Sequence, residues 1–178
     1  MTENNERSDV DLYQLMAAPL YVGLFVNVLL PMGLLFLCYY ANQNFWVTNQ
    51  VGDFADPLFW VAGILSIGQA GFALWWRTKR LQQPMIHRKE TFQGDLKANL
   101  VRLLRPVFYL IAGISLYGFL YFYLTGRFDE AVFIVVFSFL VFQVVRPRMG
   151  MIKKIVSHQE ELVKQNRFAP GSLHLPGH

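Results

Sequence analysis

Side chains able to do acid–base, metal or nucleophilic chemistry are few in this chain, and they form no catalytic pattern. The histidines all lie outside the long apolar segments: His87, His158, His174 and His178. The last two have the i, i+4 spacing of a helical metal pair, but Pro176 and Gly177 between them disfavour the helix that would align them. Cys38 is the single cysteine, which excludes an intrachain disulfide. The sequence therefore predicts no catalytic residue, no metal site and no cofactor.

A few polar residues do interrupt the apolar segments. Pro31 follows Asn27 by four residues and has no amide to bond the Asn27 carbonyl, so a helix through them should kink there. Either this kink exposes an ion or partner site at mid-membrane, or neighbouring helices satisfy the freed groups; we favour the second interpretation. Gln69 and Gln143 are expected to form hydrogen bonds across helices.

These residues sit in segments that predict an all-α, polytopic membrane protein. Three runs without a charged residue or histidine cover 19–40, 57–76 and 106–124, and each can cross a hydrocarbon core of about 30 Å as a helix. A fourth run, 131–145, is shorter and needs help from Phe128, from local thinning of the bilayer or from neighbouring helices. We take this span as 128–145. We expect a membrane domain over 19–145 that contains four transmembrane helices arranged as two hairpins.

Composition weighs against the simpler alternatives. The chain is 54% apolar and 16% charged, and its runs are too long and too apolar on every face for the buried helices of a soluble bundle. The first run is no cleavable signal peptide, because it is too long, follows an acidic segment and precedes three similar runs. The net charge of +4 could suggest nucleic acid, but nothing else in the sequence supports that.

The positive charges instead predict the topology. Of the 16 Lys and Arg residues, eight lie in the loop 77–105 and six in the tail 146–178, whereas the loops 41–56 and 125–130 hold only Arg127. Positive charge marks the cytoplasmic side. We therefore expect a cytoplasmic N-terminal segment 1–18, a cytoplasmic loop 77–105 and a cytoplasmic tail.

Amphipathic helices are expected beside the spans. A capping pattern from Ser8 to Asp11 predicts a short helix on the membrane surface before Pro19 begins the first span. Leucines at helical spacing predict a second helix over 91–105, lying on the anionic leaflet. The apolar spacing after Pro147 predicts a third, cytoplasmic helix in the tail.

Two segments suggest that the hairpins descend from a duplication. Residues 52–61 and 126–135 share the pattern G-x-F-x-acid-x-aliphatic-F-x-V, and the same offset places Gln69 on Gln143. Two hairpins related by an axis along the membrane normal would explain the match.

The second span carries a small-residue face that predicts close helix packing or a partner helix. It consists of Ala62, Gly63, Ser66, Ala70 and Gly71. No ionisable residue lies deep in any span, which weighs against a proton or ion carrier.

The order of features resembles the ATP synthase subunit I family, small four-span proteins of bacteria, over about residues 19–154. The resemblance is carried by Gly63–Ser66 leading through Gly71 to the basic segment 77–80, and by Gly94, Asp95 and Lys97 before the third span. It implies a non-enzymatic accessory protein of the bacterial inner membrane that helps to assemble or stabilise the rotor ring of the synthase; magnesium handling is also proposed for the family.

Three function hypotheses follow. The leading one is a non-enzymatic accessory or assembly protein that binds membrane lipids and the transmembrane helices of other subunits or of its own copies. The second is a small transporter or channel for magnesium or another solute, suggested by the duplication and the break at Asn27 and Pro31. The third, a membrane subunit of a redox complex, lacks axial ligands in the spans.

Overall fold

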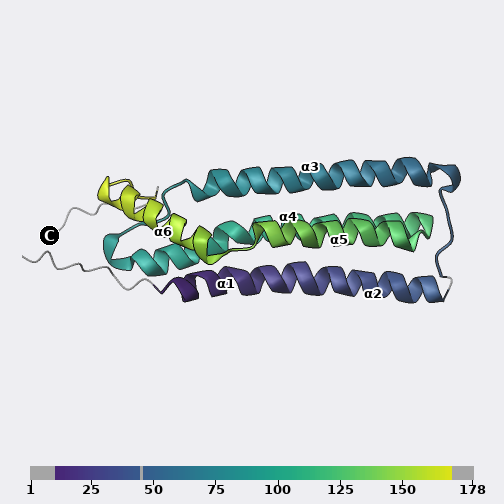
Figure 1. Cartoon of the computed structure of the whole chain (residues 1–178), viewed down its shortest axis with the longest axis horizontal. Coiled ribbons are helices and arrows are strands. Elements are labelled where there is room, and N and C mark those ends of the chain that lie inside the picture. The colour runs from purple at the N-terminus through teal and green to yellow at the C-terminus, as the bar shows by residue number, and fades with distance from the viewer. Residues whose placement is uncertain (1–10, 45, 170–178) are drawn as a thin grey trace, which may run out of the picture.

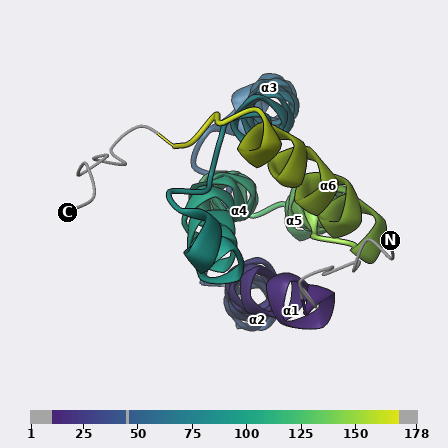
Figure 2. The same cartoon turned by 90° about the vertical axis from the view of Figure 1, so that its left-hand side faces the viewer.

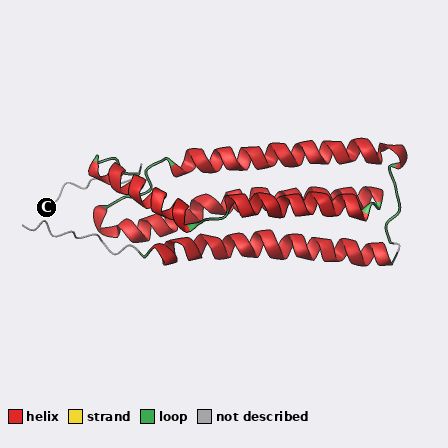
Figure 3. Ribbon diagram, in the orientation of Figure 1, coloured by secondary structure: helices red, strands yellow, loops and turns green. Residues whose placement is uncertain are grey.

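The structure, a computed structural model, describes residues 11–44 and 46–169 of the chain. Within these residues the regular elements are all helical (Figure 3). Four helices are long and apolar enough to cross a membrane: Leu12–Gln43, Gly52–Leu81, Lys89–Thr125 and Phe128–Val145. The chain is therefore an all-α, polytopic membrane protein, as the apolar runs predict. The N-terminal capping residue Ser8 and the histidines His174 and His178 lie outside the described residues.

The helices follow one another with short connections. They are α1 (Leu12–Leu24), which continues through a π-helical turn (Phe25–Leu29) into α2 (Leu30–Gln43), then α3 (Ala55–Leu81), α4 (Phe92–Thr125), α5 (Phe128–Val145) and α6 (Met149–Lys164). Short 3₁₀ turns, Gly52–Phe54 and Lys89–Thr91, precede α3 and α4.

The first span begins earlier than the sequence predicts. The Asp11 carboxylate accepts the amides of Tyr13 and Gln14, at 3.0 and 3.1 Å, and so caps α1 directly. From there the described residues form one continuous helix through Pro19. The expectation of an independent helix before Pro19 is wrong, because the Asp11 cap and the first apolar residues belong to the same continuous helix.

The predicted surface helix over 91–105 is also not separate. It forms the first half of α4, a single helix of 34 residues that contains Pro106. Its leucines Leu96, Leu100 and Leu104 are buried, at 1%, 1% and 0% exposure, and continue the inward face of the third span. At about 1.5 Å per residue α4 is about 51 Å long, longer than the hydrocarbon core, so this half extends beyond the bilayer.

α4 is the central helix of the bundle. It packs against α1, α2, α3 and α5. Seen from one end, α3 lies on one side of the α4–α5 pair, and α1 with α2 lies on the other (Figure 2). The third and fourth spans therefore form a closely packed hairpin, whereas the first and second are antiparallel but separated. Two duplicated hairpins would share one packing geometry, and these do not.

We call the end that carries the α3–α4 loop and α6 the basic end, and the opposite end, with the turns before α3 and α5, the short-loop end (Figure 1). The apolar spacing in the tail predicts an amphipathic helix, and α6 is that helix. It lies across the basic end (Figure 1) and buries Ile152, Ile155 and Leu162. Gln159, on the same face, is fully buried; it accepts the Met85 amide at 2.9 Å and donates to the Gln83 carbonyl at 3.0 Å.

Two glycines at the short-loop end make the sharp turns into the next helix. Gly52 has φ of +57° before α3, and Gly126 has φ of +70° before α5. Side chains with a Cβ rarely adopt this left-handed conformation, which explains why glycine stands at both positions of the matched pattern. The two matched segments therefore share the same left-handed glycine before a helix, although the hairpins that contain them pack differently.

Candidate functional site

The small-residue face of α3 divides between the inside and the outside of the bundle. Ala62, Ser66 and Ala70 are buried, at 8%, 2% and 6% exposure, on the side of α3 that packs on α4. These three residues therefore hold α3 to this bundle and are not open to a partner. Gly71 lies on the exposed side, together with Gly68, and a Cβ built on either glycine meets nothing within 4 Å.

Gln69 fixes α3 against α4 by two polar contacts. Its Nε2 donates to the Leu110 carbonyl at 2.5 Å, and its Oε1 accepts the Tyr117 hydroxyl at 2.5 Å. Gly113 makes room for this amide, because a Cβ there would stand 2.8 Å from Gln69 Nε2. Gln69 is therefore bonded across helices, as predicted, and its partner is α4. The prediction is wrong for Gln143: among the described residues its side chain forms no hydrogen bond to another helix, and its backbone carbonyl accepts from Arg148 at 3.0 Å.

The helix irregularity predicted at Asn27 and Pro31 is present as a π-helical turn. The turn spans Phe25–Leu29, directly before the proline that lacks an amide. Asn27 is fully buried, and its Nδ2 donates to the Gly23 carbonyl one turn earlier at 3.1 Å. Its Oδ1 is buried and has no hydrogen-bond partner among the described residues.

Two serines lie at about the same depth as this amide. A Cβ on Gly23 would stand 2.9 Å from atoms of both Phe108 and Phe142, so α1 is in close contact with α4 and α5 there. Ser138 is one turn from Phe142 toward the short-loop end, as Asn27 is from Gly23. Ser138 is fully buried, and its hydroxyl has no hydrogen-bond partner in the part of the chain that the structure describes. The buried Ser115 donates to the Ala112 carbonyl at 2.6 Å.

This buried polar layer has limited chemistry. It offers one amide oxygen and two hydroxyls from three helices, and no carboxylate. Mg²⁺ prefers carboxylates and water in octahedral geometry, so the layer does not fit that ion. Nothing in it can act as a general base or an activated nucleophile.

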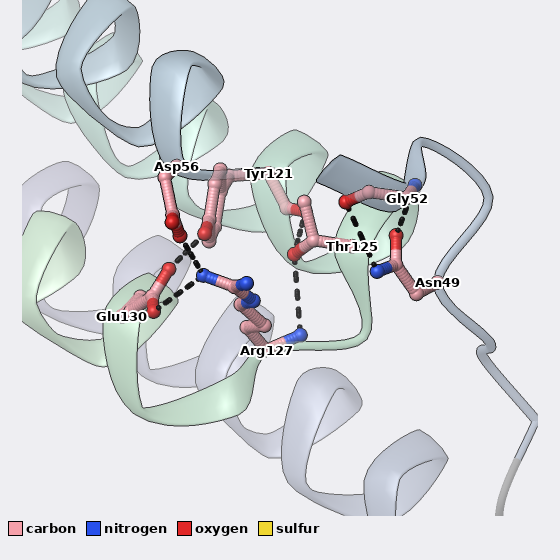
Figure 4. Close-up of polar contacts among 7 residues, drawn as sticks. All are labelled: Asn49, Gly52, Asp56, Tyr121, Thr125, Arg127 and Glu130. Atoms are coloured by element: carbon pink, nitrogen blue, oxygen red, sulfur yellow. Dashed lines mark hydrogen bonds and ion pairs between the residues drawn. The ribbon is translucent and has the colours of Figure 1, made fainter. Parts of the chain in front are cut away.

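A charged cluster closes the short-loop end (Figure 4). The Arg127 guanidinium pairs with Asp56 at the start of α3 and with Glu130 in α5, the second contact at 3.1 Å. Glu130 also accepts the Tyr121 hydroxyl, and the Thr125 hydroxyl accepts the Arg127 amide at 3.2 Å. The acidic residues of the two matched segments, Asp56 and Glu130, thus share one arginine, which links α3 to the α4–α5 turn.

The motif residues before the third span have a structural role in this chain. Asp95 accepts the His87 amide at 2.9 Å and the Thr91 hydroxyl at 3.0 Å, which ties the preceding loop to the first turn of α4. Gly94 and Lys97 are exposed, and a Cβ on Gly94 would meet nothing within 4 Å.

Several of these residues could not be singled out from the sequence. Arg127, Asp56 and Glu130 meet only because the turns before α3 and α5 lie at the same end. Gln159 did carry a signal, since it follows Ile152 and Ile155 on the apolar face of α6 and marks a polar contact within a buried face.

Across residues 11–44 and 46–169, no group of three His, Cys, Asp or Glu side chains could hold a metal ion. Cys38 is buried in the first span at 1% exposure. No family model matches the chain, and no curated protein or solved structure matches it.

Proposed function

We propose that the chain is a non-enzymatic accessory protein that binds transmembrane helices of a larger membrane assembly. The observation that supports this is the outward side of α3. Gly68 and Gly71 lie there with open space where a Cβ would stand. A glycine that faces lipid forgoes apolar contact and weakens the helix, whereas a glycine that faces another helix lets the two backbones approach closely.

Large apolar side chains surround the two glycines on the same side of α3. Trp60, Ile64, Ile67 and Trp75 are 57–69% exposed. Since the inward side of α3 is occupied by α4, a partner helix that packs over the glycines would bury a surface this chain leaves uncovered.

Two further parts of the proposal rest on the sequence. The excess of Lys and Arg at the basic end supports an orientation with this end and both termini in the cytoplasm. The bacterial inner membrane as the location rests on the resemblance to ATP synthase subunit I. The resemblance to ATP synthase subunit I supports the rotor ring of that enzyme as the assembly.

Copurification tests the proposal. A tagged chain is extracted from its native membranes in a mild detergent, and ATP synthase subunits are measured in the eluate by quantitative mass spectrometry. Gly68→Leu with Gly71→Leu should reduce their recovery by about tenfold, because the leucines fill the approach surface. Gly33→Leu is the matched control, as Gly33 is equally exposed and open but lies on α2. Equal recovery with the α3 variant and the control contradicts the proposed interface.

A transporter or channel is the second candidate, favoured by the unpaired Asn27 amide oxygen and Ser138 hydroxyl inside the bundle. The packing beside this polar layer weighs against a channel. About one turn nearer the basic end, the rings of Phe108 and Phe142 pack edge to face with their centres 5.9 Å apart. Vesicles that contain the purified protein should not release trapped magnesium, protons or small solutes. A flux that Asn27→Leu abolishes would establish a transport function in place of the accessory role.

A further inference from the structure

The basic end contains an open hollow of about 440 Å³ between the end of α3 and the start of α4. Arg80 comes from α3, Arg102 from α4, and His87 from the loop that joins them. None of the residues that line this hollow is acidic. We call it the α3–α4 basic hollow.

The two arginines of the hollow have no carboxylate partner among the described residues. Arg80 lies over the Trp76 ring, with its guanidinium carbon 6.0 Å from the ring centre, and makes a long contact of 3.4 Å with Gln83 Oε1. Both ion pairs that the described residues form involve Arg127, at the opposite end. The nearby Asp95 does not line the hollow and is already bonded to the His87 amide.

The membrane side of the hollow is apolar. Trp76, Leu103 and Pro106 line it, and the tryptophan is of the type that prefers the depth of lipid headgroups. Positive groups toward water and an apolar wall toward the bilayer match a ligand that carries both an anion and hydrocarbon.

A second, apolar hollow lies further along the same side of the α3–α4 contact. This hollow of about 190 Å³, lined almost wholly by apolar atoms, includes Leu58 of α3 and Leu124 of α4. Leu58 precedes Trp76, and Leu124 follows Pro106, by the same 18 residues. Eighteen residues make about five whole helical turns, so the two hollows face the same side of the α3–α4 pair. The same separation corresponds to about 27 Å along the helix axis.

We propose that the α3–α4 basic hollow binds the phosphate of an anionic phospholipid. The guanidinium groups of Arg80 and Arg102 donate hydrogen bonds to the phosphate oxygens from two different helices. The acyl chain lies against Trp76, Leu103 and Pro106 and extends along this side of the bundle toward the second, apolar hollow. A free phosphate would use the arginines but leave this wall uncovered, which is why the lipid is the ligand that fits. The site depends on membrane insertion and is independent of any protein partner.

Native mass spectrometry of the full chain in detergent tests the site. Dioleoyl-phosphatidylglycerol or dioleoyl-phosphatidylcholine is added, and the retained lipids are counted. The test variant is Arg80→Gln with Arg102→Gln. The control is Lys97→Gln with Lys153→Gln, which removes the same charge from exposed positions outside the hollow at the same end. Circular dichroism checks that both variants keep the helical content of the unmodified chain.

The unmodified chain and the control should retain the anionic lipid in preference to phosphatidylcholine, and the Arg80 and Arg102 variant should bind it at least about tenfold more weakly. Equal loss in variant and control would mean that only diffuse charge attracts the lipid, and would overturn the site. A competition with millimolar inorganic phosphate addresses the source of the phosphate: persistence of the lipid adduct supports the proposal, and displacement by phosphate alone overturns it.

Discussion

Replacing Gly118 by alanine should destabilise the packing of α4 on α5. A Cβ at this position would stand 2.8 Å from Val135 Cγ2 and 2.9 Å from the Ala131 carbonyl oxygen. Real Cβ atoms do not approach so closely, and neither neighbour yields easily, because one is helix backbone and the other is a stiff β-branched side chain. The two helices must therefore move apart to accommodate the methyl group.

The cost of the added methyl group is obtained by comparing the free energies of unfolding of alanine variants at two glycines. Gly63, in α3, has nothing within 4 Å of a built Cβ, so its alanine variant meets no obstruction. Both substitutions gain about 1 kcal/mol of helix propensity, while overpacking typically costs about 1–3 kcal/mol. The free energy of unfolding of Gly118→Ala should therefore lie about 1–3 kcal/mol below that of Gly63→Ala.

Reversible unfolding in mixed micelles measures this difference. The loss of tertiary structure is followed by tryptophan fluorescence, and the midpoints of the two variants are compared with that of the unmodified chain. We expect Gly63→Ala to equal or exceed the unmodified chain and Gly118→Ala to fall below Gly63→Ala. Equal stability of the two variants would show that α4 and α5 are not in backbone contact at Gly118, and the central hairpin described here would be wrong.

Three further substitutions test single contacts. Gln69→Leu should lower the free energy of unfolding by about 0.6–2 kcal/mol, measured in the same assay, because it removes both polar contacts of α3 with α4; no change would contradict the Gln69 link. Gln159→Leu should lower the stability of α6 docking by about 1–3 kcal/mol, because it leaves the Met85 amide and the Gln83 carbonyl unbonded; faster amide hydrogen exchange confined to α6 and the α3–α4 loop would show it, and unchanged exchange would refute it. Arg127→Gln should cost at most about 1 kcal/mol, and less at high salt, since the arginine side chain is 39% exposed; a salt-independent loss would contradict an exposed ion pair.

The number of spans and their approximate positions were determined by the sequence alone. Lipid demands long, uncharged helical runs, and this requirement is local in the chain, so the runs beginning at Pro19, Pro57 and Pro106 could be recognised without knowing what they pack against. The break at Asn27 and Pro31 was predictable for the same reason, because a missing amide acts on its own helix. The glycine turns before α3 and α5 likewise depend on local backbone conformation.

What only the tertiary structure decided is which faces of those helices meet. The bilayer offers apolar surroundings on all sides, so hydrophobicity does not distinguish the face of α3 that packs on α4 from the face that meets lipid. For this reason Ala62, Ser66 and Ala70 could not be separated from Gly71, and the partners of Gln69, which are Leu110 and Tyr117, could not be named. The α3–α4 basic hollow also required the fold, because Arg80 and Arg102 are brought together only when the ends of two antiparallel helices lie side by side.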